Sequence, residues 1–269
     1  MIIVFSGCGN TAATAARLAA LTGDDVVRLT PAMLRADAPE LKATGTHIVW
    51  AFPTYSWGVP PVVRRFMRRV RLDGADTLLH LMLTTCGDDI GDCASMWRAD
   101  MRARGWKPGR AFSVQMPNTY VTMRGFDVDA PEVADAKVAA MPARVTEIAA
   151  ALDVPGPDLT VRGSWAWVKT RIIYPWFVRM DMSPRPFHAT DSCTGCGACV
   201  RRCPMANIAL ADDNRPRWGA ECAFCLGCYH VCPTRSVAYG RATRGKGRWP
   251  GIKSLFNNGC EREGGHIRY

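Results

Sequence analysis

Two cysteine runs of identical spacing lie in the last third of the chain. They comprise Cys193, Cys196, Cys199 and Cys203, followed by Cys222, Cys225, Cys228 and Cys232. Each cysteine of the second run lies 29 positions after its counterpart, and each run ends in Cys-Pro. Two residues between successive cysteines let three thiolates face one 4Fe-4S cluster, so this spacing is typical of iron–sulfur centres. The sequence therefore predicts two 4Fe-4S clusters.

The last cysteine of each run is expected to bind the cluster of the other run. In the bacterial pattern, the cysteine that precedes proline binds the second cluster rather than its own. The two expected ligand sets are therefore Cys193, Cys196, Cys199 and Cys232, and Cys222, Cys225, Cys228 and Cys203. Paired Cys-x-x-Cys elements also bind zinc, but a zinc site needs neither the third cysteine nor the Cys-Pro ending. The pattern thus favours iron–sulfur clusters over zinc.

Residues 187–239 resemble the bacterial ferredoxins that carry two 4Fe-4S clusters. The resemblance rests on both cysteine runs. It implies a small α+β two-cluster ferredoxin domain and one-electron transfer.

The composition indicates two domains in a reducing compartment. The chain has 269 residues, of which 48% are hydrophobic, and this length leaves room for two domains. Residues 1–160 carry 17 Lys and Arg against 17 Asp and Glu, whereas residues 161–269 carry 17 against 7. No secretory leader is evident, and no apolar stretch approaches the roughly 18 residues that span a bilayer. Because the cluster cysteines must remain thiolates, we expect a cytoplasmic protein without a membrane span.

Strand-like and helix-like segments alternate along the first 160 residues. Strands are expected over residues 1–5, 26–29, 46–52, 78–84 and 111–116. Helices are expected over residues 11–21, 62–70, 91–104 and 131–152. This alternation predicts an α/β, flavodoxin-like doubly wound parallel sheet with strand order 2-1-3-4-5. Ligands of such sheets bind beyond the carboxyl ends of the strands.

The turn after the first expected strand has the composition of a phosphate-binding loop. It comprises Ser6, Gly7, Cys8, Gly9, Asn10 and Thr11. Small residues before a helix let backbone N–H groups converge on a phosphate. Gly7, Gly9 and Ala12 also fit the dinucleotide pattern G-x-G-x-x-A. However, Arg28 ends the second strand, where an NAD site would have an acidic residue. The loop therefore favours flavin mononucleotide (FMN), and an NADP site that uses Arg28 remains an alternative.

Two further loops are expected to hold the flavin ring. The first comprises Pro53, Thr54, Tyr55, Ser56, Trp57 and Gly58, and the second includes Thr85, Cys86, Gly87 and Asp88. At these loops the chain resembles the flavodoxin family. The resemblance implies that the FMN phosphate is held by Ser6, Gly9, Asn10 and Thr11. It also implies that Tyr55 or Trp57 flanks the ring, and that the backbone of Gly58 responds to protonation of flavin N5. The second loop lacks the tyrosine that many flavodoxins place there.

Together the two halves resemble single-chain fusions of a flavodoxin and a ferredoxin, the EFR1-type ferredoxins. Residues 113–120 and the Gly-Lys-Gly-Arg run at residues 245–248 also resemble that family. Membership implies FMN, two 4Fe-4S clusters and electron transfer. We expect an FMN-binding domain at residues 1–160, an aromatic and basic linker at 161–186, the ferredoxin domain at 187–240 and a basic extension at 241–269.

The linker mixes aromatic and basic side chains over residues 165–180. Pro175 is expected to interrupt a long amphipathic helix there. Packing of the linker on the FMN-binding domain is therefore favoured over contact with a membrane surface or a partner.

The predicted function is a relay of electrons between FMN, two 4Fe-4S clusters and a redox partner protein. The basic excess has two equally favoured interpretations: it steers a redox partner with an acidic surface, or it forms a solvated or cluster-facing surface that offsets the negative charge of the clusters. Nucleic-acid binding is not favoured, since no recognition module accompanies the basic tail. One alternative is a flavin-dependent oxidoreductase that reduces a small molecule or exchanges hydride with NAD(P)H. A binding module with structural clusters is a further alternative, and no catalytic residue is predicted.

Overall fold

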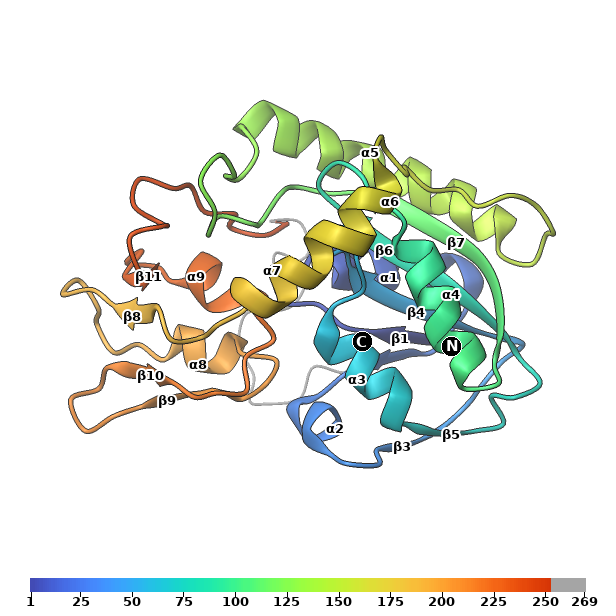
Figure 1. Cartoon of the computed structure of the whole chain (residues 1–269), viewed down its shortest axis with the longest axis horizontal. Coiled ribbons are helices and arrows are strands. Elements are labelled where there is room, and N and C mark those ends of the chain that lie inside the picture. Colours follow the sequence, from blue (N-terminus) through green and yellow to red (C-terminus); the bar gives the residue numbers. More distant parts are fainter. Residues whose placement is uncertain (253–269) are drawn as a thin grey trace.

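Five parallel strands form the central sheet of the computed structural model, which describes residues 1–252 (Figure 1). The strands are β1 (Ile2–Val4), β2 (Val26–Arg28), β4 (His47–Pro53), β6 (Leu79–Cys86) and β7 (Lys107–Gln115). They lie in the order β2-β1-β4-β6-β7, and every neighbouring pair is parallel. The predicted α/β class with a parallel sheet is confirmed.

Helices cover both faces of this sheet (Figure 1). One face carries α1 (Asn10–Thr22) and α5 (Pro131–Ala151), and the other carries α3 (Pro61–Arg69) and α4 (Cys93–Ala103). Successive side chains of a strand point to opposite faces. Accordingly, Ile2 and Val4 pack into the core under α1 and α5, whereas Ile3 and Phe5 pack into the core under α3 and α4. We call residues 1–160 the α/β region.

The elements that the sequence did not predict are short. They are α2 (Pro31–Arg35), β3 (Glu40–Lys42) and β5 (Arg71–Asp73). The two strands pair with each other in parallel, outside the main sheet. Strand β7 also begins four residues earlier than predicted, because Pro108 and Gly109 near its start hide its strand character.

A continuous helical segment links the two halves of the chain (Figure 1). It consists of α6 (Ala166–Val168), a π-helical turn (Lys169–Ile173) and α7 (Tyr174–Met180). We call residues 166–180 the bridging helix. The predicted interruption at Pro175 is wrong, because a π-helical turn directly precedes α7 and the helix continues through this residue to Met180. The buried side of the helix packs on the α/β region, since Tyr174 Oη donates to the carbonyl of Val59 at 2.5 Å.

Residues 187–239, the cysteine-rich region, are built from a structural repeat. The first copy contains β8 (Phe187–Ala189), α8 (Ala198–Arg202) and β9 (Ile208–Leu210). The second copy contains β10 (Pro216–Trp218), α9 (Gly227–Val231) and β11 (Val237–Tyr239), each 29 residues after its counterpart. Strand β8 pairs with β11 and β9 pairs with β10, both antiparallel. Each small sheet therefore takes one strand from each copy, so the two copies are intertwined.

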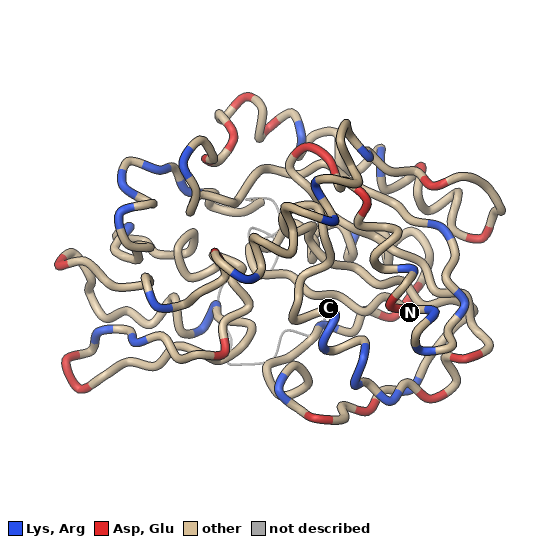
Figure 2. Tube along the Cα trace, viewed as in Figure 1, with Lys and Arg blue, Asp and Glu red and all other residues tan. Residues whose placement is uncertain are grey.

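Basic residues continue along the chain after α9, where Figure 2 shows several blue segments. Arg241 and Arg244 are exposed there. The expected basic extension continues beyond residue 252, and its Lys253 and Cys260 lie outside the described residues. Within residues 1–252, no helix combines the length and the apolar character needed to cross a membrane.

Candidate functional site

The loop between β1 and α1 borders a small cavity, the loop cavity, of about 100 Å³. Gly9 precedes α1 with φ +103°, and no side chain within residues 1–252 caps the helix. The N–H groups of the first helical turn are therefore available to an anion. Of the predicted loop residues, the cavity is lined by Ser6, Gly7, Cys8, Asn10 and Thr11, whereas Gly9 forms the turn behind them.

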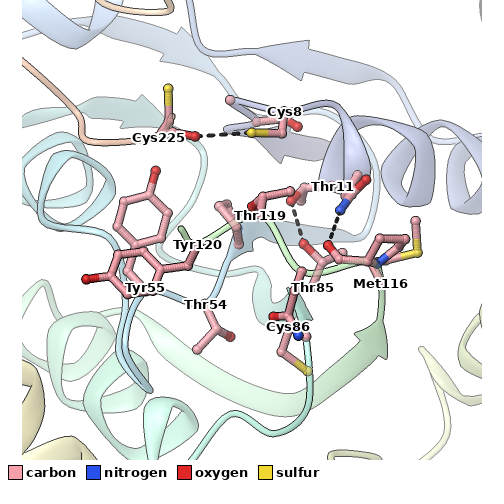
Figure 3. A pocket seen from close by; sticks show the side chains of 17 residues that line it. Cys8, Thr11, Thr54, Tyr55, Thr85, Cys86, Met116, Thr119, Tyr120 and Cys225 are labelled. Atoms are coloured by element: carbon pink, nitrogen blue, oxygen red, sulfur yellow. Dashed lines mark hydrogen bonds between the residues drawn. The ribbon is translucent and has the colours of Figure 1, made fainter. Parts of the chain in front are cut away.

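Hydrogen bonds hold this loop against other parts of the chain. Thr11 Oγ1 lies 2.7 Å from Thr85 Oγ1 at the end of β6 (Figure 3). Asn10 Nδ2 donates to the carbonyl of Pro117 at 2.9 Å, and Trp249 Nε1 donates to Asn10 Oδ1 at 2.9 Å. The loop is thus fixed by the sheet edge and by the segment that follows the cysteine-rich region.

A larger cavity, the aromatic cavity, adjoins the loop cavity and has a volume of about 390 Å³. This volume lies in the range typical of small-molecule sites. From the α/β region it is lined by the predicted residues Pro53, Thr54, Tyr55, Ser56, Trp57, Cys86, Gly87 and Asp88. The remaining predicted residue of the second loop, Thr85, lines the loop cavity.

Gly58 does not line either cavity, contrary to its predicted role. Its N–H donates to the carbonyl of Tyr55 at 2.9 Å. A β-carbon at Gly58 would lie 2.4 Å from Cδ2 of Tyr174 in the bridging helix. The glycine therefore permits close packing of the bridging helix rather than access to a ligand. Arg28 is likewise absent from the lining of both cavities.

The aromatic side chain missing from the loop after β6 is supplied by the segment after β7. Tyr120 lines both cavities and packs edge-to-face on Phe126 and Phe177, with ring centroids 5.5 and 5.6 Å apart. Tyr55 lies beside it in the pocket (Figure 3). Sequence reasoning named Tyr120 among the candidate proton donors near the ring, and it missed Asn118 as a lining residue.

Asn118 is held in place by a buried carboxylate. Its backbone N–H and its Nδ2 both donate to Asp129 at 3.0 Å, and Lys137 Nζ donates to the same carboxylate at 2.7 Å. Burial opposes ionisation of Asp129, but the bonds from Lys137 and Asn118 hold the pKa of its carboxyl below the ordinary value. A charged Asp129 therefore orients an amide that faces the cavity.

The cysteine-rich region brings Cys203 together with the second run. Cys203, Cys222, Cys225 and Cys228 line one cavity of about 20 Å³, closed by apolar side chains such as Phe187 and Ile208. This grouping is the second ligand set expected from the sequence. Among residues 1–252, no three His, Cys, Asp or Glu side chains converge closely enough to hold a single metal ion.

Three members of the other expected set lie near one another. Burial raises the pKa of the Cys199 thiol, and the nearby Cys232 and Cys193 raise it further. The fourth member, Cys196, is exposed. Cys199 is in turn a close neighbour of Cys228, so the two sets adjoin inside the region.

Backbone N–H groups point at several of these sulfurs. Asn207 N donates to Cys203 Sγ at 3.3 Å, Phe224 N to Cys222 Sγ at 3.3 Å, and Ser236 N to Cys232 Sγ at 3.2 Å. Hydrogen bonds to thiolate sulfurs are among the factors that set cluster potentials. The donor set therefore fits iron–sulfur clusters.

The second cysteine run packs directly on the loop after β1. Cys8 Sγ donates to the carbonyl of Cys225 at 3.1 Å, as the dashed line in Figure 3 shows. A β-carbon at Gly7 would lie 2.3 Å from Cβ of Cys225, and one at Gly227 would lie 2.9 Å from the carbonyl oxygen of Gly7. Burial raises the pKa of Cys8 to about 11, so the thiol is a protonated donor at neutral pH. Glycine is needed on both sides of this contact.

Cys225 and two apolar neighbours complete the aromatic cavity from the side of the cysteine-rich region. Phe224 and Leu226 line it in left-handed conformations, with φ +53° and +57°. The equivalent residues of the first copy, 29 positions earlier, are Gly195 and Gly197, with φ +66° and +70°. Bulky residues in this conformation cost about 1–2 kcal/mol each, and such strain is concentrated at functional sites. The second copy thus accepts strain where its side chains close the cavity.

A basic side chain from the cysteine-rich region reaches the loop after β1. A β-carbon at Gly9 would lie 3.3 Å from Nη2 of Arg202, which follows Cys199 in α8. Arg202 also acts on Cys8, since its charge lowers the pKa of that thiol, although burial has the larger, opposite effect. The guanidinium adds positive charge to a loop already suited to an anion. The sequence pattern alone did not indicate this role.

The buried hydroxyl of Tyr55 indicates whether a ligand fits the cavities. It is buried and has no hydrogen-bond partner among the described residues. Burial raises its pKa well above the ordinary value, and the nearby Cys225, Cys8 and Cys222 add to the shift. A buried donor that faces a cavity without a partner normally bonds a ligand or water. The uncapped helix, Arg202, the aromatic cavity and this hydroxyl together fit a planar ligand with a phosphate group.

Comparison with known proteins identifies the cysteine-rich region. Residues 185–233 match the family model of the 4Fe-4S dicluster domain. This part of the chain is an iron–sulfur, ferredoxin-type domain for electron transport.

Three solved structures are similar to parts of the chain at low identity. A putative flavoprotein from Bacteroides uniformis is 16% identical over 43% of this chain and 90% of its own, with a TM-score of 0.35. A putative flavoprotein from Bacteroides eggerthii is 20% identical over 41% and 85%, with a TM-score of 0.31. The Trp repressor binding protein from Bacillus subtilis is 12% identical over 54% and 94%, with a TM-score of 0.34.

Proposed function

We propose that this protein relays electrons between FMN, two 4Fe-4S clusters and an external redox partner. The observation that carries the proposal is the position of Cys225. This expected cluster ligand lines both the loop cavity and the aromatic cavity. A flavin there would have the cluster of the second set as its immediate neighbour.

The residues present suit FMN in particular. The phosphate would be held by the first turn of α1, with Ser6, Thr11 and Arg202 around it. The ring would occupy the aromatic cavity, lined by Tyr55, Trp57 and Tyr120. Because Cys225 and Gly227 close over Gly7, the loop cavity has no room for the second nucleotide of a dinucleotide. This closure supports FMN over NADP.

A bound flavin exchanges one or two electrons, whereas a 4Fe-4S cluster exchanges one. The chain contributes the positioning and the dry environment. Phe224 and Leu226 exclude water between the aromatic cavity and the Cys222 set, and Cys199 lies near enough to Cys228 to raise the pKa of its thiol, so the second set lies near the first. Because Cys196 is exposed, a cluster held by the first set would exchange electrons with a partner at this surface.

The surface around Cys196 includes one basic side chain that suits an acidic partner. Arg201 Nη1 donates to the carbonyl of Cys196 at 3.0 Å, whereas Arg215 and Arg217 on the same region are paired with Asp191 and Asp213. Charges of opposite sign accelerate the encounter of redox proteins. The proposal includes domain boundaries after residues 160, 186 and 240. It also includes membership of the EFR1-type fusions and a cytoplasmic location.

Anaerobic purification followed by a reductive titration tests it. The expected result is bound FMN, identified by chromatography of the released cofactor, together with iron for two 4Fe-4S clusters, all reduced in one titration. Clusters without flavin, or a retained nicotinamide nucleotide, would contradict the proposal.

A further inference from the structure

The bridging helix exposes an unusual apolar surface. Trp165, at its start, is 78% exposed, Trp167 is 59% exposed and Trp176 is 52% exposed. Ile172 and Met180 are exposed beside them. No other tryptophan among residues 1–252 is exposed. Several large, exposed apolar side chains on one segment normally mark a contact with a membrane or another protein.

The opposite side of the same helix explains why this surface is fixed. Ala166, Thr170, Tyr174 and Phe177 are buried, at the spacing of one helical face. Thr170 Oγ1 donates to the carbonyl of Trp57 at 2.7 Å and accepts from Asp92 N at 2.8 Å. The helix is therefore anchored to the α/β region, and its tryptophan side is held outward.

The charges on the bridging helix indicate which kind of partner binds its exposed side. Residues 165–180 contain Lys169, Arg171 and Arg179 and no acidic residue, as Figure 2 shows for this helix. Lys169 is paired with Asp89 at 2.6 Å. Arg171 and Arg179 are exposed and make no ion pair within residues 1–252. The exposed side thus combines interfacial aromatic side chains with unpaired positive charge, which is the composition of helices that lie on anionic bilayers.

We propose that the bridging helix docks the protein on an anionic lipid surface, with Trp165, Trp167 and Trp176 in the headgroup layer and Arg171 and Arg179 on lipid phosphates. This inference goes beyond the relay and does not depend on it. Ile173 and Phe177 also line the aromatic cavity, so the docked surface adjoins the wall of that cavity.

Co-sedimentation of the full holoprotein with lipid vesicles tests the proposal. Vesicles of phosphatidylcholine mixed with phosphatidylglycerol are compared with vesicles of phosphatidylcholine alone. The protein is expected to bind the mixed vesicles and to be released by salt. Substitution of Trp167 and Trp176 by alanine should weaken partitioning about tenfold or more, because binding scales with buried apolar area.

Charge variants supply a second measurement that does not depend on packing. Loss of one arginine at an anionic surface weakens binding about fivefold. The variant R171A/R179A should therefore bind far more weakly than R241A/R244A, which removes the same charge from an exposed site elsewhere. Equal binding by the two charge variants would overturn the proposal. So would wild-type protein that ignores anionic vesicles, or that self-associates through these tryptophans in sedimentation velocity without binding lipid.

Discussion

The thiol of Cys8 donates a hydrogen bond of 3.1 Å to the carbonyl of Cys225, across 217 residues of sequence. One partner belongs to the loop that suits a phosphate, and the other belongs to a cysteine run that suits a cluster. Residues 7 and 227 are glycines at the same contact, so the two backbones meet without intervening side chains. This contact places two candidate redox sites against each other.

Arg202→Gln should weaken FMN binding. The guanidinium lies over Gly9, and loss of one charged hydrogen bond costs about 1.5–3 kcal/mol, which corresponds to roughly 10–100-fold in the dissociation constant. Reconstitution of flavin-free protein, followed by fluorescence quenching, measures the change. Arg201→Gln is the matched control, because Arg201 bonds Cys196 instead. Riboflavin, which lacks the phosphate, should bind both variants and the wild type alike; an equal loss for riboflavin would refute a phosphate contact.

Leu226→Gly restores the residue type of the first copy and should open the aromatic cavity. It relieves left-handed strain but removes a cavity wall, so we expect flavin affinity to fall by about tenfold while the iron content stays unchanged. The reciprocal change, Gly197→Leu, should cost about 1–2 kcal/mol of stability and leave flavin affinity intact. Unaltered flavin binding in Leu226→Gly would show that this side chain serves only the local core.

Tyr55→Phe should lower the reduction potential of the cluster held by the second set. Burial and, after it, the nearby Cys225, Cys8 and Cys222 raise the pKa of this hydroxyl, which has no hydrogen-bond partner within residues 1–252. A donor near the sulfurs stabilises the more negative reduced cluster. Tyr120→Phe is the control, since Tyr120 lines the same cavity, and the pKa of its hydroxyl, raised to about 12 chiefly by burial, responds to Thr122 and Asp181 rather than to cysteines. Potentiometric titration with paramagnetic resonance detection compares them, and equal potentials in both variants would argue against the contact.

Cys203→Ser and Cys232→Ser test the crossed ligation. Cys203 lies with Cys222, Cys225 and Cys228. Its loss should therefore disturb the cluster beside the flavin and leave the cluster of Cys193, Cys196 and Cys199. Cys232→Ser should have the opposite effect, and each variant should retain about half of the iron. Loss of the flavin-proximal cluster in Cys232→Ser but not in Cys203→Ser would reverse the assignment.

His80 should make stability depend on pH. Trp50 Nε1 donates to His80 Nδ1 at 2.9 Å, so the ring is neutral and its Nε2–H donates to the carbonyl of Ala75 at 3.1 Å. Burial lowers the pKa of His80 below 6.5. Below pH 6.5 the unfolded chain binds more protons than the folded one. The contribution of neutral His80 to the free energy of unfolding is therefore complete above pH 6.5 and is lost as the pH falls. The urea midpoint, followed by tryptophan fluorescence, should decline less steeply with acid in His80→Gln, whereas exposed His188→Gln should keep the wild-type slope.

The sequence was a good guide to elements whose pattern is local. Apolar strands and periodic helices of the α/β region were predicted to within two residues, apart from the start of β7. The cysteine runs indicated clusters because the spacing of the cysteines is by itself characteristic of cluster ligands. Strand β3, with the sequence Glu-Leu-Lys, is too short to show a period and lacks the apolar run that indicated β1 and β2.

The closure of the site could not be read from local pattern. Tyr120 and Leu226 reach the cavities, and Arg202 reaches Gly9, only because distant segments pack together. Gly58 matched a motif, yet the ring of Tyr174 occupies the space beside it. Pro175 suggested a break, but a π-helical turn precedes it and the helix continues. Comparison of the two copies offered one overlooked signal, namely Phe224 and Leu226 at positions where the first copy has glycines.

The most direct test of the relay is a kinetic one. Anaerobic holoprotein is reduced by a one-electron pulse, and the cluster and flavin absorbances are followed at several protein concentrations. The account predicts that clusters reoxidise as flavin is reduced, in a first-order step whose rate does not change with concentration. A rate proportional to protein concentration, or clusters that stay reduced beside an oxidised flavin, would contradict it.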